Sequence, residues 1–221
     1  MPSIVPDWLT MPDEDFHGGF RPTATPTPAY LHRALVRALG PAVVTVPTDD
    51  ALKGKPLVLR LGLPLPPQLR FYVYQATQNA AERQTGTYKV QLTRGMTAAE
   101  IAGGSSIPSQ AARRSARLYF DRSGGIRPIL MGYHPDWRLF ILWDADLHDL
   151  GDGFTYSTSV YAPPQTVIDA LVHGLSRGSR SLKPRGTSET VIAVRPRQLV
   201  EALALRIRLS TEAMTHTDGL F

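Results

Sequence analysis

The chain has 221 residues, a formal net charge of +5 at pH 7 and no cysteine. These totals exclude disulfides, thiolate zinc sites and cysteine nucleophiles, and they indicate a reducing compartment. No apolar run approaches the ~18 residues of a membrane span, and the N-terminus lacks the basic and apolar regions of a secretory signal. We therefore expect a cytoplasmic protein with no membrane partner.

Arginine supplies most of the positive charge. A basic balance suits a polyanionic partner such as nucleic acid. The alternative explanation is a GC-rich genome, which favours arginine and alanine codons whatever the protein binds. Charge alone therefore leaves nucleic-acid binding as one of two interpretations.

The segment Ile126–Asp144 is the centre of the predicted fold. Two apolar runs, Ile129–Tyr133 and Leu139–Trp143, flank a break at His134-Pro135-Asp136. Proline presets φ and aspartate can hydrogen-bond its own backbone, so this break is typical of a turn. Both runs are almost continuously apolar, as in strands covered on both faces. We predict a buried β-hairpin against which the other elements pack.

The chain divides into an arm, one domain and a tail. Residues 1–29 form a Pro/Thr-rich arm with little drive to fold alone, residues 30–209 a single domain, and residues 210–221 a loose tail. Apolar spacing predicts a helix at Tyr30–Leu39. β-Branched and aromatic content predicts further strands at Leu57–Leu63, Leu69–Thr77, Gly86–Thr93, Ala116–Asp121, Phe154–Ala162 and Glu189–Val194.

Strands and helices alternate near the C-terminus. Pro163-Pro164 opens a helix over Gln165–His173, and a last helix over Arg197–Leu209 has apolar residues on one face. The segment Gly174–Gly186 is rich in glycine, serine and basic residues, and we predict a loop there. The predicted class is α+β, with a curved, mainly antiparallel mixed sheet and a C-terminal β-α-β-α ending.

Two basic clusters are the candidate DNA-binding residues. Small residues separate the basic ones in the predicted loop, so the backbone could approach phosphates while arginine donates bidentate hydrogen bonds. A mobile solvated loop is the equally weighted alternative. The two clusters together are Arg113, Arg114, Arg117, Arg177, Arg180, Lys183 and Arg185.

Acidic residues after the hairpin are candidates for a metal site. A restriction-type nuclease needs an aspartate and a later acid-x-Lys triplet to hold a divalent metal. Asp136 and Asp144 bracket one strand, but no such triplet follows Asp144 or Asp146. His148 lies among acids in one loop, where exposed carboxylates are the ordinary case. We predict no metal site, no catalytic residue and no cofactor.

A resemblance to a known family rests on four segments in order. They are RFYVYQATQNAAERQTGTYKVQLT, PILMGYHPDWRLFILWDADLH, TYSTSVYAPPQTVIDAL and SETVIAVRPRQLVEAL. This order resembles the N-terminal recognition domains of HNH-type restriction endonucleases and the accessory domains found beside DNA methylases in bacterial defence loci. The shared features include Trp143-Asp144, His148 and Arg195-Pro196.

The resemblance spans about Leu69 to Ile207 and implies DNA recognition. No nuclease domain is attached, so it implies that another chain supplies catalysis. We therefore predict a DNA-binding recognition protein of a bacterial restriction–modification or related defence system. Its partners would be double-stranded DNA and a nuclease or methylase subunit, and the DNA read could be methylated. The alternatives are a metal-dependent restriction-type nuclease and a protein-interaction subunit of a defence complex.

Overall fold

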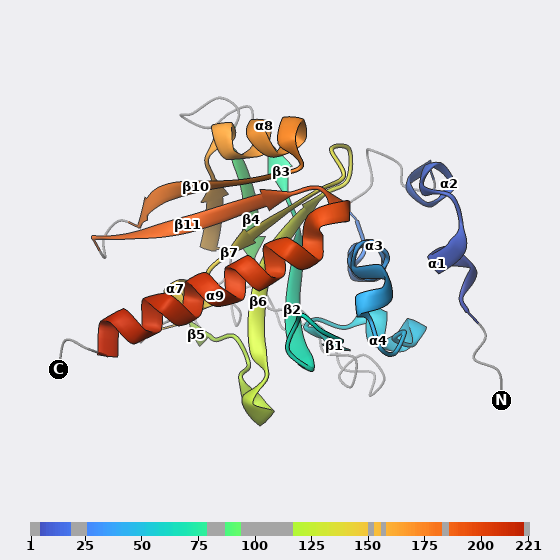
Figure 1. Cartoon of the computed structure of the whole chain (residues 1–221), viewed down its shortest axis with the longest axis horizontal. Coiled ribbons are helices and arrows are strands. Elements are labelled where there is room, and N and C mark those ends of the chain that lie inside the picture. The colour runs from blue at the N-terminus through green and yellow to red at the C-terminus, as the bar shows by residue number, and fades with distance from the viewer. Residues whose placement is uncertain are drawn as a thin grey trace.

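The computed structural model describes residues 5–18, 26–78, 87–93, 117–149, 153–155, 158–182 and 186–218. Its centre is a curved six-stranded sheet with the order β1-β2-β6-β7-β11-β10 (Figure 1). The strands are β1 (Leu57–Arg60), β2 (Gln68–Gln75), β6 (Arg127–His134), β7 (Leu139–Trp143), β10 (Leu175–Leu182) and β11 (Thr187–Val194). β2 and β6 are parallel, and the other neighbours are antiparallel. The predicted α+β class with a mainly antiparallel mixed sheet is confirmed.

The predicted central hairpin is formed by β6 and β7. Leu130 is paired with Trp143, and His134 with Leu139. Both strands are buried along almost their whole length. Because successive side chains of a strand point to opposite faces, the hairpin contributes Met131 to one core and Leu130 to the other. Burial on both faces explains the two continuous apolar runs.

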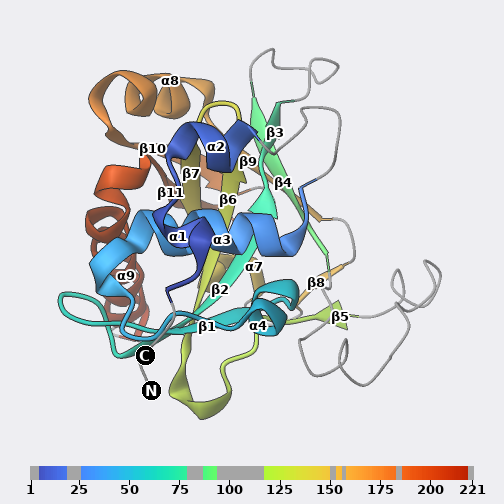
Figure 2. The same cartoon turned by 90° about the vertical axis from the view of Figure 1, so that its right-hand side faces the viewer.

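A helix and a second, smaller sheet cover one face. The helix is α8 (Pro164–His173), and the sheet has the order β3-β4-β9 (Figure 2). Its strands are β3 (Thr77–Gln78), β4 (Tyr88–Leu92) and β9 (Thr158–Ala162). Val90, Val160 and Val167 belong to the core on this face. A two-stranded sheet pairs β5 (Arg117–Leu118) with β8 (Phe154–Thr155).

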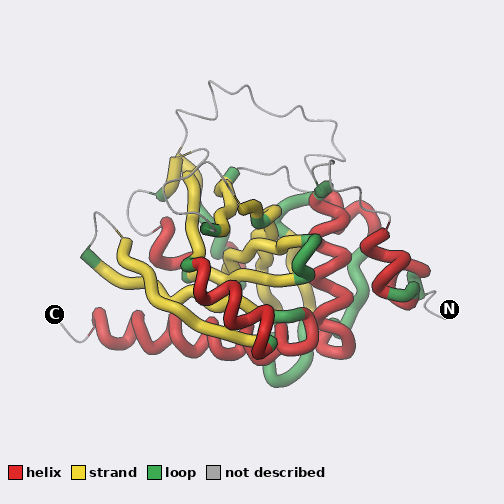
Figure 3. Tube along the Cα trace, turned by 90° about the horizontal axis from the view of Figure 1, so that it is seen from above, coloured by secondary structure: helices red, strands yellow, loops and turns green. Residues whose placement is uncertain are grey.

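Helices cover the opposite face. The main ones are α3 (Pro28–Leu39) and α9 (Leu199–Asp218), which share a core with Ile192 and Val194 of β11. The Thr27 hydroxyl caps α3 by accepting from the Tyr30 N–H. The smaller helices are α1 (Asp7–Thr10), α2 (Asp13–Gly18), α4 (Asp49–Lys53) and α7 (Ala145–Asp149), with the 3₁₀ turns η1 (Gly40–Ala42), η2 (Ser123–Gly125) and η3 (Pro196–Gln198). α1 and α2 lie at the opposite end of the molecule from the C-terminal end of α9 (Figure 3).

Three parts of the chain differ from the sequence-based expectation. The predicted loop Gly174–Gly186 is wrong over most of its length, because β10 pairs with β11 from Leu175 to Leu182. The ending therefore contains one strand more than predicted. The last helix continues beyond Leu209 to Asp218. Within residues 1–29, α1 and α2 bury Trp8 and Phe16 in the main core.

Within the described ranges, no helix is long and apolar enough to cross a membrane.

Candidate functional site

The turn between β6 and β7 presents a tryptophan and an arginine at one end of the sheet. Trp137 is 42% exposed. Arg138 has φ of +46°, in the left-handed region that a residue with a Cβ rarely adopts. Its N–H donates to Pro135 O at 3.0 Å, and Arg195 Nη1 donates to Trp137 O at 2.7 Å. These two bonds hold the turn in one conformation.

Further arginines lie on the elements next to this turn. The Arg195 N–H donates to Gly174 O at 2.7 Å, which places the start of β10 beside η3. Arg177 lies opposite Ile192 on the face covered by α9 and is exposed, about 10 Å along the strand from Gly174. Arg197 in η3 is also exposed. We call Arg138, Arg177, Arg195 and Arg197 the basic end.

Three guanidinium groups of the basic end have no hydrogen-bond or ion-pair partner among the described residues. Arg138, Arg177 and Arg197 make no side-chain hydrogen bond or ion pair with any residue in the described part of the chain. Arg195 differs, because its guanidinium also donates to Leu171 O at 3.2 Å. The basic end thus combines one bracing arginine with three available cations.

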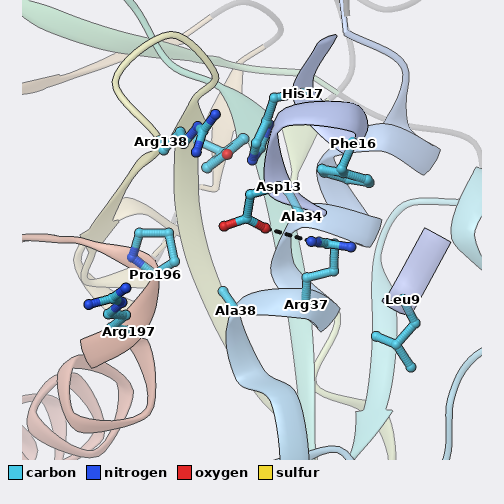
Figure 4. A pocket seen from close by; sticks show the side chains of 11 residues that line it. Leu9, Asp13, Phe16, His17, Ala34, Arg37, Ala38, Arg138, Pro196 and Arg197 are labelled. Atoms are coloured by element: carbon cyan, nitrogen blue, oxygen red, sulfur yellow. Dashed lines mark hydrogen bonds and ion pairs between the residues drawn. The ribbon is translucent and has the colours of Figure 1, made fainter. Parts of the chain in front are cut away.

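A cavity of about 260 Å³ opens at the basic end, between α2, α3, the β6–β7 turn and η3 (Figure 4). Its polar lining includes Asp13, His17, Arg37, Arg138 and Arg197. Arg37 donates to the carboxylate of Asp13 and to the carbonyl oxygens of Trp8 and Met11. Arg37 therefore fastens the N-terminal helices to α3 and forms one wall of the cavity.

A buried charge network lies at the other end of β7. Glu189 of β11 is fully buried and accepts from the Asp144 N–H at 2.8 Å and from Arg180 Nε at 2.6 Å. His148 Nε2 lies 3.0 Å from Glu189 Oε1. Burial alone would raise the pKa of Glu189, but the hydrogen bonds and charges of His148 and Arg180 outweigh burial and lower that pKa. The Glu189 carboxylate is therefore ionised in the folded protein at neutral pH.

Asp144 connects this network to α9. Its Oδ2 accepts from Arg206 Nη2 at 2.9 Å and from Ser210 Oγ at 3.0 Å, and its Oδ1 accepts from the Asp146 N–H at 3.0 Å. Arg206 also donates to Thr190 O at 2.6 Å. Asp144 and Arg206 are both almost fully buried. The network therefore joins the end of β7 to β11 and α9, and its contacts are structural.

The lowered pKa of Glu189 predicts a defined acid dependence of stability. A carboxyl group whose pKa falls on folding stabilises the protein above its unfolded pKa of about 4.5 and loses that contribution as pH falls through the lower folded value. Glu189→Gln should therefore lower the unfolding free energy most at neutral pH, and its difference from the wild type should shrink below about pH 4. Urea unfolding at a series of pH values measures this difference. A difference independent of pH would contradict it.

The structure describes three of the seven predicted DNA-binding residues. Arg113, Arg114, Lys183 and Arg185 lie outside the described residues. Arg117 is exposed on β5, and Arg177 belongs to the basic end. Arg180 is half-buried and paired with Glu189, so its guanidinium is occupied within the protein.

The acids of the nuclease alternative are far apart. Asp136 lies in the turn before β7 and Asp144 directly after it, so the five residues of β7 separate them by roughly 17 Å. A single metal ion cannot be bound by both. In the described part of the chain, no group of three His, Cys, Asp or Glu side chains is arranged to hold a metal.

Several residues of these two regions escaped sequence reasoning. Glu189 precedes the apolar run Val191–Val194 of β11 and shares a face with Val191 and Ala193. Arg206 occupies the apolar stripe of α9, at helical spacing from Leu199, Leu203 and Ser210. A charged residue at a core position indicates a buried ion pair, so this signal was available. No comparable sequence signal marked Arg37, Arg138 or Arg197, because arginine is common on helices and in turns.

The protein is thus an α+β domain built on a mixed sheet that is covered on both faces. Among the described residues, no recognised catalytic arrangement of side chains is present. The chain belongs to the Methylase-associated X1 (MTaX1) family, whose model matches residues 67–203. No curated protein and no solved structure is detectably similar to it. The predicted resemblance to methylase-associated accessory domains is confirmed, whereas the resemblance to HNH-type recognition domains stays a prediction. Family membership indicates a role related to restriction–modification.

Proposed function

We propose that the chain binds double-stranded DNA through its basic end, in support of a methylase or nuclease partner in a restriction–modification system. The observation that carries the proposal is that Arg138 and Arg197 line one cavity next to the turn with the exposed Trp137. Arg177 lies on the neighbouring edge strand, and none of the three guanidinium groups has an internal partner among the described residues. Unpaired guanidinium groups are suited to phosphate oxygens and to guanine edges. A protein associated with methylases has DNA as its natural polyanionic partner.

The salt dependence of duplex affinity should report the number of phosphate contacts. Each phosphate contact releases a condensed counterion, so the slope of log affinity against log salt falls by roughly one for each contact removed. Arg177→Gln with Arg197→Gln should therefore weaken duplex binding roughly tenfold and reduce the slope by about two. Fluorescence anisotropy with a labelled duplex at several salt concentrations measures both quantities.

A matched control separates this effect from a general loss of charge. Lys53 on α4 and Arg60 on β1 are both exposed, so Lys53→Gln with Arg60→Gln removes the same charge from other surfaces. This control should shift affinity little and leave the slope near the wild-type value. Equal slopes for the two double variants would rule out the basic end as the DNA interface. The single variant Arg117→Gln tests the other predicted cluster in the same assay.

Reading of modified DNA is a finer part of the proposal. The same titration with unmodified and cytosine-methylated duplexes of one sequence tests it. Preference for methylated DNA would make the chain a modification reader. Equal affinity would leave a DNA-binding subunit that does not sense methylation, and the absence of binding at low salt would overturn the DNA proposal altogether.

A further inference from the structure

The cavity at the basic end has an excess of positive charge. Three guanidinium groups, those of Arg37, Arg138 and Arg197, face one carboxylate, that of Asp13. Burial is the main cause that lowers the pKa of His17, and the Arg138 charge lowers it further, so His17 is neutral at pH 7. Among the side chains that line the cavity, the positive charges therefore outnumber the negative ones by two.

The internal contacts show which arginines could receive a ligand. Arg37 is committed to Asp13 and to two backbone carbonyl groups of the N-terminal segment. Asp13 in turn cancels one charge and would repel an anion that came close to it. Arg138 and Arg197 have no such contacts with the described residues. An anion would thus bind at the side of the cavity formed by the β6–β7 turn and η3, opposite α1 and α2.

The backbone conformation of Arg138 supports the same position for the anion. Its φ of +46° is strained for an arginine, and glycine or asparagine would fit this turn position better. The side chain gains no hydrogen bond or ion pair inside the described structure in return. Strain that packing does not explain is typical of residues positioned for a ligand. Figure 4 shows the Arg138 side chain beside His17 at the cavity.

We propose that this cavity binds a terminal phosphate monoester, with Arg138 and Arg197 as its main ligands. A monoester carries close to two negative charges at neutral pH, which matches the excess charge of the cavity, whereas a phosphodiester carries one. A diester within a strand also has a sugar on each side, so the helices and turns around the cavity would keep it at the rim, where the exposed Arg197 can still contact it. A terminal phosphate projects from its chain and can enter.

Two sources supply this chemistry, namely the 5′-phosphate end of a DNA strand and a free nucleoside monophosphate. The inference rests on the proposed DNA binding only for the first source. Three short DNAs of one sequence separate them: a duplex with 5′-phosphates, a duplex with 5′-hydroxyls and a covalently closed circle. A deoxynucleoside 5′-monophosphate, titrated alone by calorimetry, tests the second source.

The full chain should bind the 5′-phosphorylated duplex about tenfold more tightly than the 5′-hydroxyl duplex, as expected for added charge-assisted hydrogen bonds. Arg138→Gly should abolish this preference. Because glycine accepts a positive φ, the same variant should melt at the wild-type temperature or above it. Arg60→Gln, at an exposed position on β1, is the control and should keep the preference.

The outcomes separate this inference from the proposed function. Equal affinity for all three DNAs would overturn the inference and leave DNA binding intact. A preference for 5′-phosphate that survives in Arg138→Gly would also overturn the assignment to this cavity. Binding of the monophosphate alone, lost in Arg138→Gly, would support the cavity while overturning DNA as the partner. Binding of neither DNA nor monophosphate would overturn both proposals.

Discussion

Asp144→Asn should lower the free energy of unfolding by about 3–5 kcal/mol, the usual cost of leaving one charge of a buried ion pair without its partner. The substitution keeps the shape of the side chain but removes its charge. Arg206, only 4% exposed, would then lose the only carboxylate with which it makes an ion pair among the described residues. Asp144 also accepts from Ser210 and from the Asp146 N–H, so an amide NH₂ group at this position would face donors.

Urea unfolding followed by circular dichroism measures this loss. Asp136→Asn is a matched control, because Asp136 is exposed in the β6–β7 turn and its replacement should change stability by less than about 0.5 kcal/mol. Adding Arg206→Met to Asp144→Asn should recover part of the loss, since the orphaned charge is removed. A loss below 1 kcal/mol for Asp144→Asn would show that the buried pair contributes little.

Gly132→Ala should destabilise the protein by about 1–3 kcal/mol, the range for forcing extra volume into a packed core. Gly132 of β6 faces the small sheet, and a Cβ there would lie 2.6 Å from Val90 Cγ1, 3.1 Å from Ala76 Cβ and 3.3 Å from Trp143 Cζ3. All three neighbours are buried, so the two sheets would have to move apart. The absence of a side chain at this position allows their close approach.

Thermal and urea unfolding of Gly132→Ala test this packing. Gly62→Ala is the control, because a Cβ there would meet its nearest atoms at 3.9 and 4.0 Å, and its backbone is not in the left-handed region. The control should leave stability within about 0.5 kcal/mol of the wild type. Equal stability of the two variants would mean that the interface between the sheets relaxes without cost.

The hairpin was predictable from sequence, whereas its edge partner was not. The runs Ile129–Tyr133 and Leu139–Trp143 are apolar because they lie between two cores, and burial of this kind leaves a clear pattern. β10 has no such pattern, since one of its edges pairs with no strand of the described residues and the Arg177 side chain is exposed. Its pairing with β11 is long-range information that local composition cannot carry. Gly178, which suggested a loop, instead allows Thr166 of α8 to approach the strand.

The charge network could be predicted only in part. Sequence reasoning singled out Asp144 and His148 but took them for loop residues, because their partners are distant in the chain. Arg206 lies 62 residues after Asp144, and Glu189 lies 41 residues after His148. The N-terminal arm illustrates the same limit. Its proline-rich composition predicts a segment with little drive to fold alone, whereas α1 and α2 form there and Trp8 and Phe16 pack into the main core.

The position of α9 limits where the chain can be truncated without loss of folding. The family match ends at residue 203, yet Arg206 and Ser210, which neutralise the buried Asp144, follow that limit. The family match also begins only at residue 67, so it leaves out α3, whose Leu35 belongs to the main core. A recombinant fragment cut at the family limits would therefore expose apolar surface and an unpaired carboxylate. The autonomous folding unit is larger than the segment by which its relatives are recognised.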